Sequence, residues 1–168
     1  MNNFPKMNTF IPVATVTELE QAKDKRMHLT ISKRNVTVAS HKSKVFCFDS
    51  VCFHMGGPFG NGDIEDYFDD TIITCPWHAY KISIMDGAKY HKPVTFDPRT
   101  KSPIAHSWEK ATECSQRIHE ARVDDQGTIH IRLNSCEQEI QSDHYAFNPL
   151  ASSCLLKSRK QSVHSKHH

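Results

Sequence analysis

The chain has 168 residues, of which 38% are hydrophobic and 24% are charged, and its formal net charge is +2 at pH 7. This length predicts one domain with a proper core, and so small a net charge gives no reason to expect nucleic acid or an anionic membrane as a partner. No run approaches the roughly 18 apolar residues that span a bilayer, and Met1–Phe10 lacks the apolar stretch of a secretory signal. We therefore expect a cytoplasmic protein whose six cysteines are free or bind metal.

In chain order, the first third of the sequence predicts short strands and one helix. Between the first two strands, the segment TVTELEQAK reads as helical, with Thr17 as its N-cap and Glu20 completing a capping box. The last two strands and the HKSK segment between them form a predicted hairpin. The predicted strands are rich in β-branched and apolar residues and cover residues 11–16, 27–31, 35–41 and 44–50.

The rest of the chain also predicts β structure. Residues 71–75 suit a buried strand, and residues 80–90 and 117–133 each read as two strands joined by a Gly-containing turn. Between Phe96 and Cys114 we expect a long connection with two prolines, which is either a functional loop or simply irregular. We expect one all-β domain over residues 1–150 and a disordered basic tail over 151–168.

Two short motifs combine cysteine with histidine. Cys52 and His54 lie two residues apart in CFHMGGP, and Cys75 and His78 lie three apart in CPWHAYKI. Each motif follows a predicted strand, so the two loops can converge on one site. Thiolate and imidazole are metal ligands, and the Gly-Gly-Pro turn lets backbone N–H groups approach whatever is bound. The sequence therefore predicts a metal centre built from these four side chains.

These motifs together resemble the Rieske iron–sulfur family, over about residues 11–133. The resemblance implies an antiparallel β-sandwich or barrel with a cluster-binding subdomain inserted at about residues 51–87. It also implies one [2Fe-2S] cluster per subunit, in which Cys52 and Cys75 bind one iron while His54 and His78 bind the other. Such mixed ligation gives potentials of roughly −150 to +300 mV.

The motifs GDIED, QRIH and DHYA are similar to those of the small soluble Rieske domain-containing proteins of animals. Respiratory members of the family carry a bridged cysteine pair, at places that look like Gly57 and Trp77 here. They also offer a serine hydroxyl to a sulfide shortly after the last histidine, where Ala79 sits with Tyr80 next. Because hydrogen bonds to sulfur raise the potential, the resemblance implies a low-potential ferredoxin.

The predicted role is therefore the transfer of single electrons, without a substrate site or catalytic residues of the protein's own. The chain after Tyr90 is too short to add the mononuclear iron domain of a Rieske oxygenase. A redox partner, which is a reductase, an oxygenase-type acceptor or both, could dock on the five acids between Asp63 and Asp70. Such a run is also typical of a solvated acidic turn.

Two other interpretations stay open. Zinc also accepts two cysteines and two histidines, so the same residues could hold a structural zinc ion, or a purely structural cluster, in a non-redox binding module. The chain could also be the small subunit of a larger reductase, such as a nitrite reductase.

Overall fold

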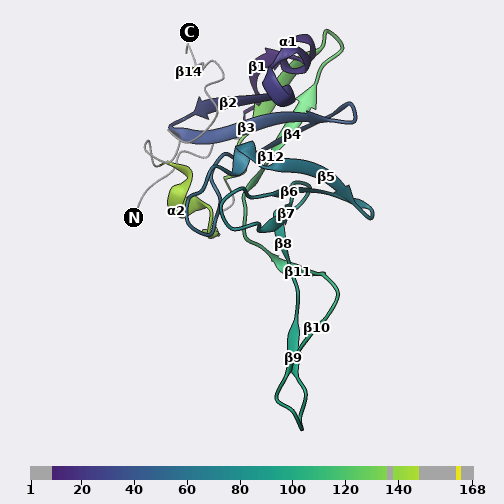
Figure 1. Ribbon diagram of the computed structural model, residues 1–168. Coiled ribbons are helices and arrows are strands. Elements are labelled where there is room, and N and C mark those ends of the chain that lie inside the picture. Colours follow the sequence, from purple (N-terminus) through teal and green to yellow (C-terminus); the bar gives the residue numbers. More distant parts are fainter. Residues whose placement is uncertain (1–8, 136–137, 148–161, 164–168) are drawn as a thin grey trace.

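The computed structural model describes residues 9–135, 138–147 and 162–163 of the chain. Strands dominate it, so the predicted all-β class is confirmed, and most of them belong to two sheets (Figure 1). The larger sheet has the order β1-β13-β12-β4-β3-β2-β14, antiparallel except for the β14–β2 pair. Its strands are β1 Ile11–Thr15, β2 Arg26–Ile31, β3 Arg34–His41, β4 Lys44–Asp49, β12 Ile118–Val123, β13 Thr128–Arg132 and β14 Ser162–Val163.

The second sheet is antiparallel and has the order β11-β8-β7-β6-β5. Beyond it, β9 and β10 form a separate two-stranded hairpin that extends away from both sheets (Figure 1). The strands are β5 Asp63–Tyr67, β6 Asp70–Thr74, β7 Lys81–Ser83, β8 Ala88–His91, β9 Val94–Phe96, β10 Pro103–Ala105 and β11 Glu109–Cys114. The helical segments are α1 Val16–Gln21, α2 Asp143–Ala146 and the 3-10 turns η1 Lys23–Lys25 and η2 Phe59–Asn61. None of the helices in the described ranges is long and apolar enough to cross a membrane.

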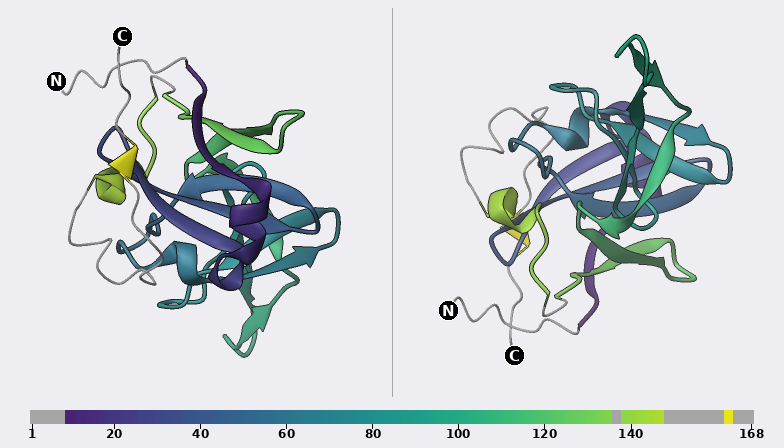
Figure 2. Two further views of the ribbon diagram at one scale, coloured as in Figure 1. Left: turned by 90° about the horizontal axis from the view of Figure 1, so that it is seen from above. Right: turned by 90° about the horizontal axis from the view of Figure 1, so that it is seen from below.

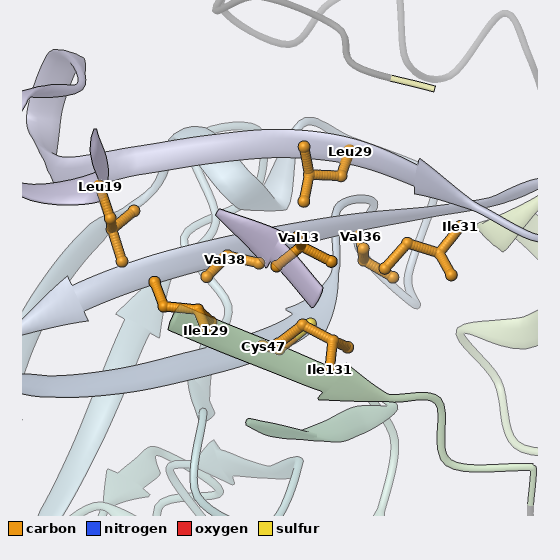
Figure 3. Packing of buried hydrophobic residues seen from close by; sticks show 9 residues of the cluster. All are labelled: Val13, Leu19, Leu29, Ile31, Val36, Val38, Cys47, Ile129 and Ile131. Atoms are coloured by element: carbon orange, nitrogen blue, oxygen red, sulfur yellow. The ribbon is translucent and has the colours of Figure 1, made fainter. Parts of the chain in front are cut away.

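A first hydrophobic core packs against one face of the larger sheet (Figure 3). Successive strand residues point to opposite faces, so Val36 and Val38 of β3 and Ile129 and Ile131 of β13 both enter this core. Helix α1 lies over β2 and β3 (Figure 2) and contributes Leu19. The other members are Val13, Leu29, Ile31 and Cys47.

A second core lies between the two sheets and includes both predicted cysteine ligands. Strand β4 shows the division, because Cys47 enters the first core and the next residue, Phe48, enters the second. The Phe48 ring packs edge-on against Phe59, with ring centroids 5.4 Å apart. The remaining members are Ala39, Cys52, Phe53, Ile73, Cys75, Ile82 and Ile84. Both predicted cysteine ligands therefore lie within a packed apolar layer.

Two local predictions are wrong in detail. The N-cap of α1 is Thr15, not Thr17, because the Thr15 hydroxyl accepts the Glu18 N–H while the Glu18 carboxylate accepts the Thr15 N–H. The connection predicted to be irregular between Phe96 and Cys114 contains β10 and β11. Of the predicted tail, Ser162–Val163 pairs with β2 and the other residues lie outside the described part.

A buried ionic network ties the C-terminal segment to the larger sheet. The Asp49 carboxylate at the end of β4 has no solvent exposure. It accepts two hydrogen bonds from Arg34, at 2.6 and 2.7 Å, and one from the Ser142 hydroxyl at 2.7 Å. Asp143 accepts hydrogen bonds from both Arg34 and Arg117. The start of α2 is thereby fixed to β3, β4 and the start of β12.

Two glycines with nearly the same φ angle allow the steric cost of an added side chain to be separated from the cost of a left-handed backbone. Gly87 has φ +80° and an added Cβ would lie 1.9 Å from the Gln116 carbonyl oxygen, whereas Gly127 has φ +79° and nothing within 4 Å. We expect Gly127→Ala to lower the free energy of unfolding by about 1–2 kcal/mol, the cost of a left-handed alanine. Gly87→Ala should cost about 3–5 kcal/mol because the backbone must also shift. Urea denaturation measures both, and equal losses would contradict the close approach.

The dependence of stability on pH in the acid range tests the contribution of Asp143 to the ionic network. Burial would raise the pKa of Asp143, but Arg117, the Ile140 N–H and Arg34 lower it to about 2. Because this pKa lies below the unfolded value of about 3.9, its stabilisation is present above about pH 4 and is lost as the pH falls towards about 2.

Asp143→Asn should therefore lower the free energy of unfolding by about 3 kcal/mol at neutral pH, and by much less at about pH 2.5. Urea denaturation at both pH values checks this. Asp125→Asn, in an exposed turn, is the control and should change little at either. A loss for Asp143→Asn that is independent of pH would show that the carboxylate charge is not what stabilises the network.

Candidate metal centre

The first ligand loop, residues 50–58, follows β4 and closes on itself through backbone hydrogen bonds. The Cys52 N–H donates to the Gly57 carbonyl at 2.8 Å, and the Gly56 N–H donates to the Cys52 carbonyl at 3.0 Å. Gly56 has φ +70°. The loop therefore turns back over Cys52 and presents His54 at its outer end.

The second ligand loop, residues 75–80, joins β6 to β7 and repeats the same pattern. The Cys75 N–H donates to the Tyr80 carbonyl at 2.8 Å, and the Ala79 N–H donates to the Cys75 carbonyl at 2.9 Å. Ala79 has φ +55° and occupies the place in this loop that Gly56 has in the first. Each predicted cysteine ligand thus starts a loop with one left-handed residue four positions later.

The two loops bring the cysteine side chains together in the second core. Cys52 and Cys75 are each 1% exposed. The neighbouring Cys75 thiol and burial raise the pKa of Cys52, whereas the neighbouring Cys52 thiol lowers the pKa of Cys75 to about 6. Backbone N–H groups of Trp77 and His78 also lower the pKa of Cys75. The site therefore favours a thiolate at Cys75.

The two predicted histidine ligands meet on the outer side of the cysteines. The Nδ1 atoms of His54 and His78 lie 3.3 Å apart, and the rings are nearly perpendicular at 88°. Two nitrogen ligands at about 2.0–2.1 Å from a tetrahedral metal are themselves about 3.3 Å apart. The imidazole pair is therefore arranged as two ligands of one metal ion would be, with Nδ1 as the ligand atom of both.

The structure places the four predicted site residues as two pairs, with Cys52 and Cys75 buried in one core and His54 and His78 in contact nearer the surface. Within the described ranges, no three Cys, His, Asp or Glu side chains surround one point closely enough to hold a single metal ion. A Rieske cluster asks for two protein ligands at each of two irons. The donor set fits that requirement, with the sulfur pair for one iron and the imidazole pair for the other.

Aromatic side chains support both loops. The Tyr80 ring centroid lies 4.7 Å from that of His54 and 5.3 Å from that of Phe53. Trp77 covers Gly57, since an added Cβ there would lie 2.9 Å from the indole ring. The two positions at which the sequence lacks a bridged cysteine pair are therefore in contact, and Trp77 packs between the loops while half of it stays exposed.

Gln116 is a positioning residue that the sequence did not reveal. It is fully buried, and its side-chain oxygen accepts the Phe53 N–H at 2.9 Å. Its side-chain nitrogen donates to the carbonyls of Asp49 and Val51, at 3.1 and 2.7 Å. One amide thus fixes the chain on both sides of Cys52. The QRIH motif contains this glutamine, but the motif indicates only the family resemblance and no role for the side chain.

The acidic segment proposed for docking is strand β5 and the start of β6, and much of its charge is already paired. Asp63 lies opposite Thr74, next to the second ligand loop, while the Phe68–Asp69 turn is at the far end of β5, roughly 15 Å along the strand. The ion pairs are Glu65 with Lys81 at 2.6 Å, Asp66 with Lys42, and Asp70 with Lys110 at 2.7 Å.

Known proteins share both the sequence pattern and the fold. Residues 13–136 match the family model of soluble Rieske-type ferredoxins. A human Rieske domain-containing protein is 32% identical over 142 residues, which cover 84% of this chain and 87% of the human protein.

Among solved structures, one from Mycobacterium tuberculosis, described as an NADH-dependent nitrite reductase small subunit, has a TM-score of 0.54 at 14% identity, covering 76% of this chain and 96% of that one. A chain in the oxygenase–ferredoxin complex of carbazole 1,9a-dioxygenase has a TM-score of 0.50 at 18% identity, covering 75% of this chain and 29% of that one. These likenesses show the fold, and the family match shows the membership: the chain belongs to the soluble Rieske-type ferredoxins.

Proposed function

We propose that this protein is a low-potential ferredoxin that binds one [2Fe-2S] cluster and carries single electrons between redox proteins. The observation that carries the proposal is the pairing of donors, with Cys52 and Cys75 buried together and His54 and His78 facing each other outside them. The cysteines would hold one iron and the histidines the other. When bound, the cluster supplies a one-electron couple near the lower end of the Rieske range, about −150 mV.

The protein's own residues isolate one side of the centre and open the other. The second core excludes water from the two sulfurs, whereas His78 lies at the surface and His54 is only half buried. The imidazole edges are therefore the part of the centre that a partner can approach. Met55 and Trp77, which neighbour the histidines, are 57% and 51% exposed and offer apolar contact there.

We infer that a redox protein partner docks at this histidine end. The fold shared with a nitrite reductase small subunit and with a chain of an oxygenase–ferredoxin complex supports a reductase or an oxygenase-type acceptor. The acidic segment Asp63–Asp70 would add a second contact, mainly through Asp63, since ion pairs already neutralise much of its remaining charge. We place this exchange in the cytoplasm, with neither nucleic acid nor membrane involved.

A second candidate function is that of a small subunit in a larger reductase, favoured by the likeness to the nitrite reductase subunit. A partner that co-purifies in a fixed ratio would distinguish it from a freely diffusing carrier. The zinc-module alternative requires the same four side chains, so metal content decides it.

Metal analysis with visible and EPR spectroscopy tests the proposal on protein purified without oxygen. We expect about two iron and two sulfide per chain, and a rhombic EPR signal after reduction by dithionite. Cys75→Ser and His78→Ala should each abolish the signal because each removes a ligand. The matched controls are Cys114→Ser and His106→Ala, two exposed residues outside the site, and these should retain it. A colourless wild-type protein with about one tightly bound zinc per chain would replace this function with the zinc module.

A further inference from the structure

We propose that residues 142–146, which form the C-terminal clamp, set the position of the first ligand loop, and that Tyr145 is a positioning residue for His54. The inference deepens the proposed function, because the loop it positions carries two of the predicted cluster ligands. Figure 1 shows α2, which contains most of the clamp, on the side of the fold where the chain leaves β4 and runs to η2.

Tyr145 contacts the first ligand loop in two ways. Its hydroxyl donates a hydrogen bond to the His54 carbonyl at 3.4 Å. Its ring lies against Gly56, since an added Cβ at that glycine would be 2.8 Å from the Tyr145 Cδ1 atom. One side chain therefore covers both the histidine and the turn that follows it.

The second ligand loop shows that this contact, and not the backbone alone, explains the glycine. Ala79 occupies the equivalent place with φ +55°, so the same left-handed turn forms there with a Cβ. Ala79 is exposed, whereas Gly56 is buried under the tyrosine ring. The left-handed conformation is costly but accessible to alanine. The glycine is required at position 56 because the tyrosine ring takes the space of a side chain.

The ionic network holds the first residue of the clamp, Ser142. The Ser142 hydroxyl donates to Asp49 at 2.7 Å and accepts the Arg117 N–H at 2.9 Å. At the other end, the Asn35 side chain donates to the Ala146 carbonyl at 3.1 Å. Tyr145 therefore projects from a turn fixed at both ends to the larger sheet, and it transmits that fixed position to the loop.

Groups that contact metal ligands orient them, and their removal typically costs 10–100-fold in metal affinity. Without the Tyr145 side chain, water could reach the hydrogen bond from the Gly56 N–H to the Cys52 carbonyl. The His54 carbonyl would also lose its hydrogen bond from the tyrosine hydroxyl. We therefore expect Tyr145 to affect both the mobility of the loop and the retention of the cluster.

The test compares Tyr145→Ala with Tyr67→Ala in the full-length protein. Tyr67 is a tyrosine that packs edge-on against two aromatic rings, Phe68 and Tyr90, but it lies on β5 and not on the clamp. We expect Tyr145→Ala to speed hydrogen exchange at the Gly56 amide about tenfold, to speed cluster loss to a chelator about tenfold, and to shift the EPR g-values. Tyr67→Ala should change none of these, and Tyr145→Phe, which keeps the ring, should retain most of the wild-type behaviour.

A double variant tests the steric contact directly. Gly56→Ala should speed cluster loss in the wild-type background, because the new Cβ meets the tyrosine ring. In the Tyr145→Ala background, Gly56→Ala should lower the free energy of unfolding, measured with urea, by no more than Gly127→Ala does. An alanine at position 127 meets no neighbouring atom, so its only cost is the left-handed backbone angle. An additive effect of the two changes would overturn the clamp.

The outcomes separate the clamp from the proposed function. If the wild type shows the cluster spectrum and Tyr145→Ala matches it in exchange, cluster loss and g-values, the clamp is wrong and the function stands. If the wild type shows no cluster, the proposed function fails, while exchange at the Gly56 amide still decides the clamp. Should Tyr145→Ala not fold, Gly56→Ala alone decides, since unchanged exchange and cluster loss in that variant would overturn the proposal.

Discussion

A single buried carboxylate organises this protein. Asp49 ends β4 with no solvent exposure, and an unpaired charge in such a place would be very costly. Burial alone would raise the pKa of Asp49, but the hydrogen bonds from His119 and Arg34 together have the larger effect. The pKa therefore lies below its usual value, and the carboxyl group stays ionised. His119 belongs to β12, Arg34 to β3 and Ser142 to the segment before α2. The hydrogen bonds to this one charge therefore hold those three parts of the chain against β4. The first ligand loop begins at the next residue.

The ligand loops depend on this frame in different degrees. Each closes through its own backbone hydrogen bonds, which gives them the same local shape. The second loop connects β6 and β7, which pair with each other directly, so strand pairing alone holds its ends. The first loop has no such hairpin, since the chain continues into η2 and then β5. It relies instead on long-range contacts from Gln116 and Tyr145.

That difference explains what could be predicted from the sequence. The four ligand candidates stand in short motifs whose loops close locally, so their convergence followed from motif and strand pattern. Gln116 and Tyr145 act across 63 and 91 residues, and nothing near them in the sequence indicates which segment they meet. The N-cap of α1 shows a subtler limit. Thr15 and Thr17 each have a glutamate three residues later, and pairing of β1 with β13 up to Thr15 selects the first.

The prolines in the connection after β8 are typical of irregular structure, yet Pro103 begins a strand, a position where its missing N–H does little harm. The hairpin to which it belongs is exposed at every residue of β9 and β10, and its turn lies at residues 97–102. Exposed loop tips tolerate insertions well. The turn is therefore the natural place to insert an affinity tag or a spectroscopic label while leaving the ligand loops and both cores unaltered.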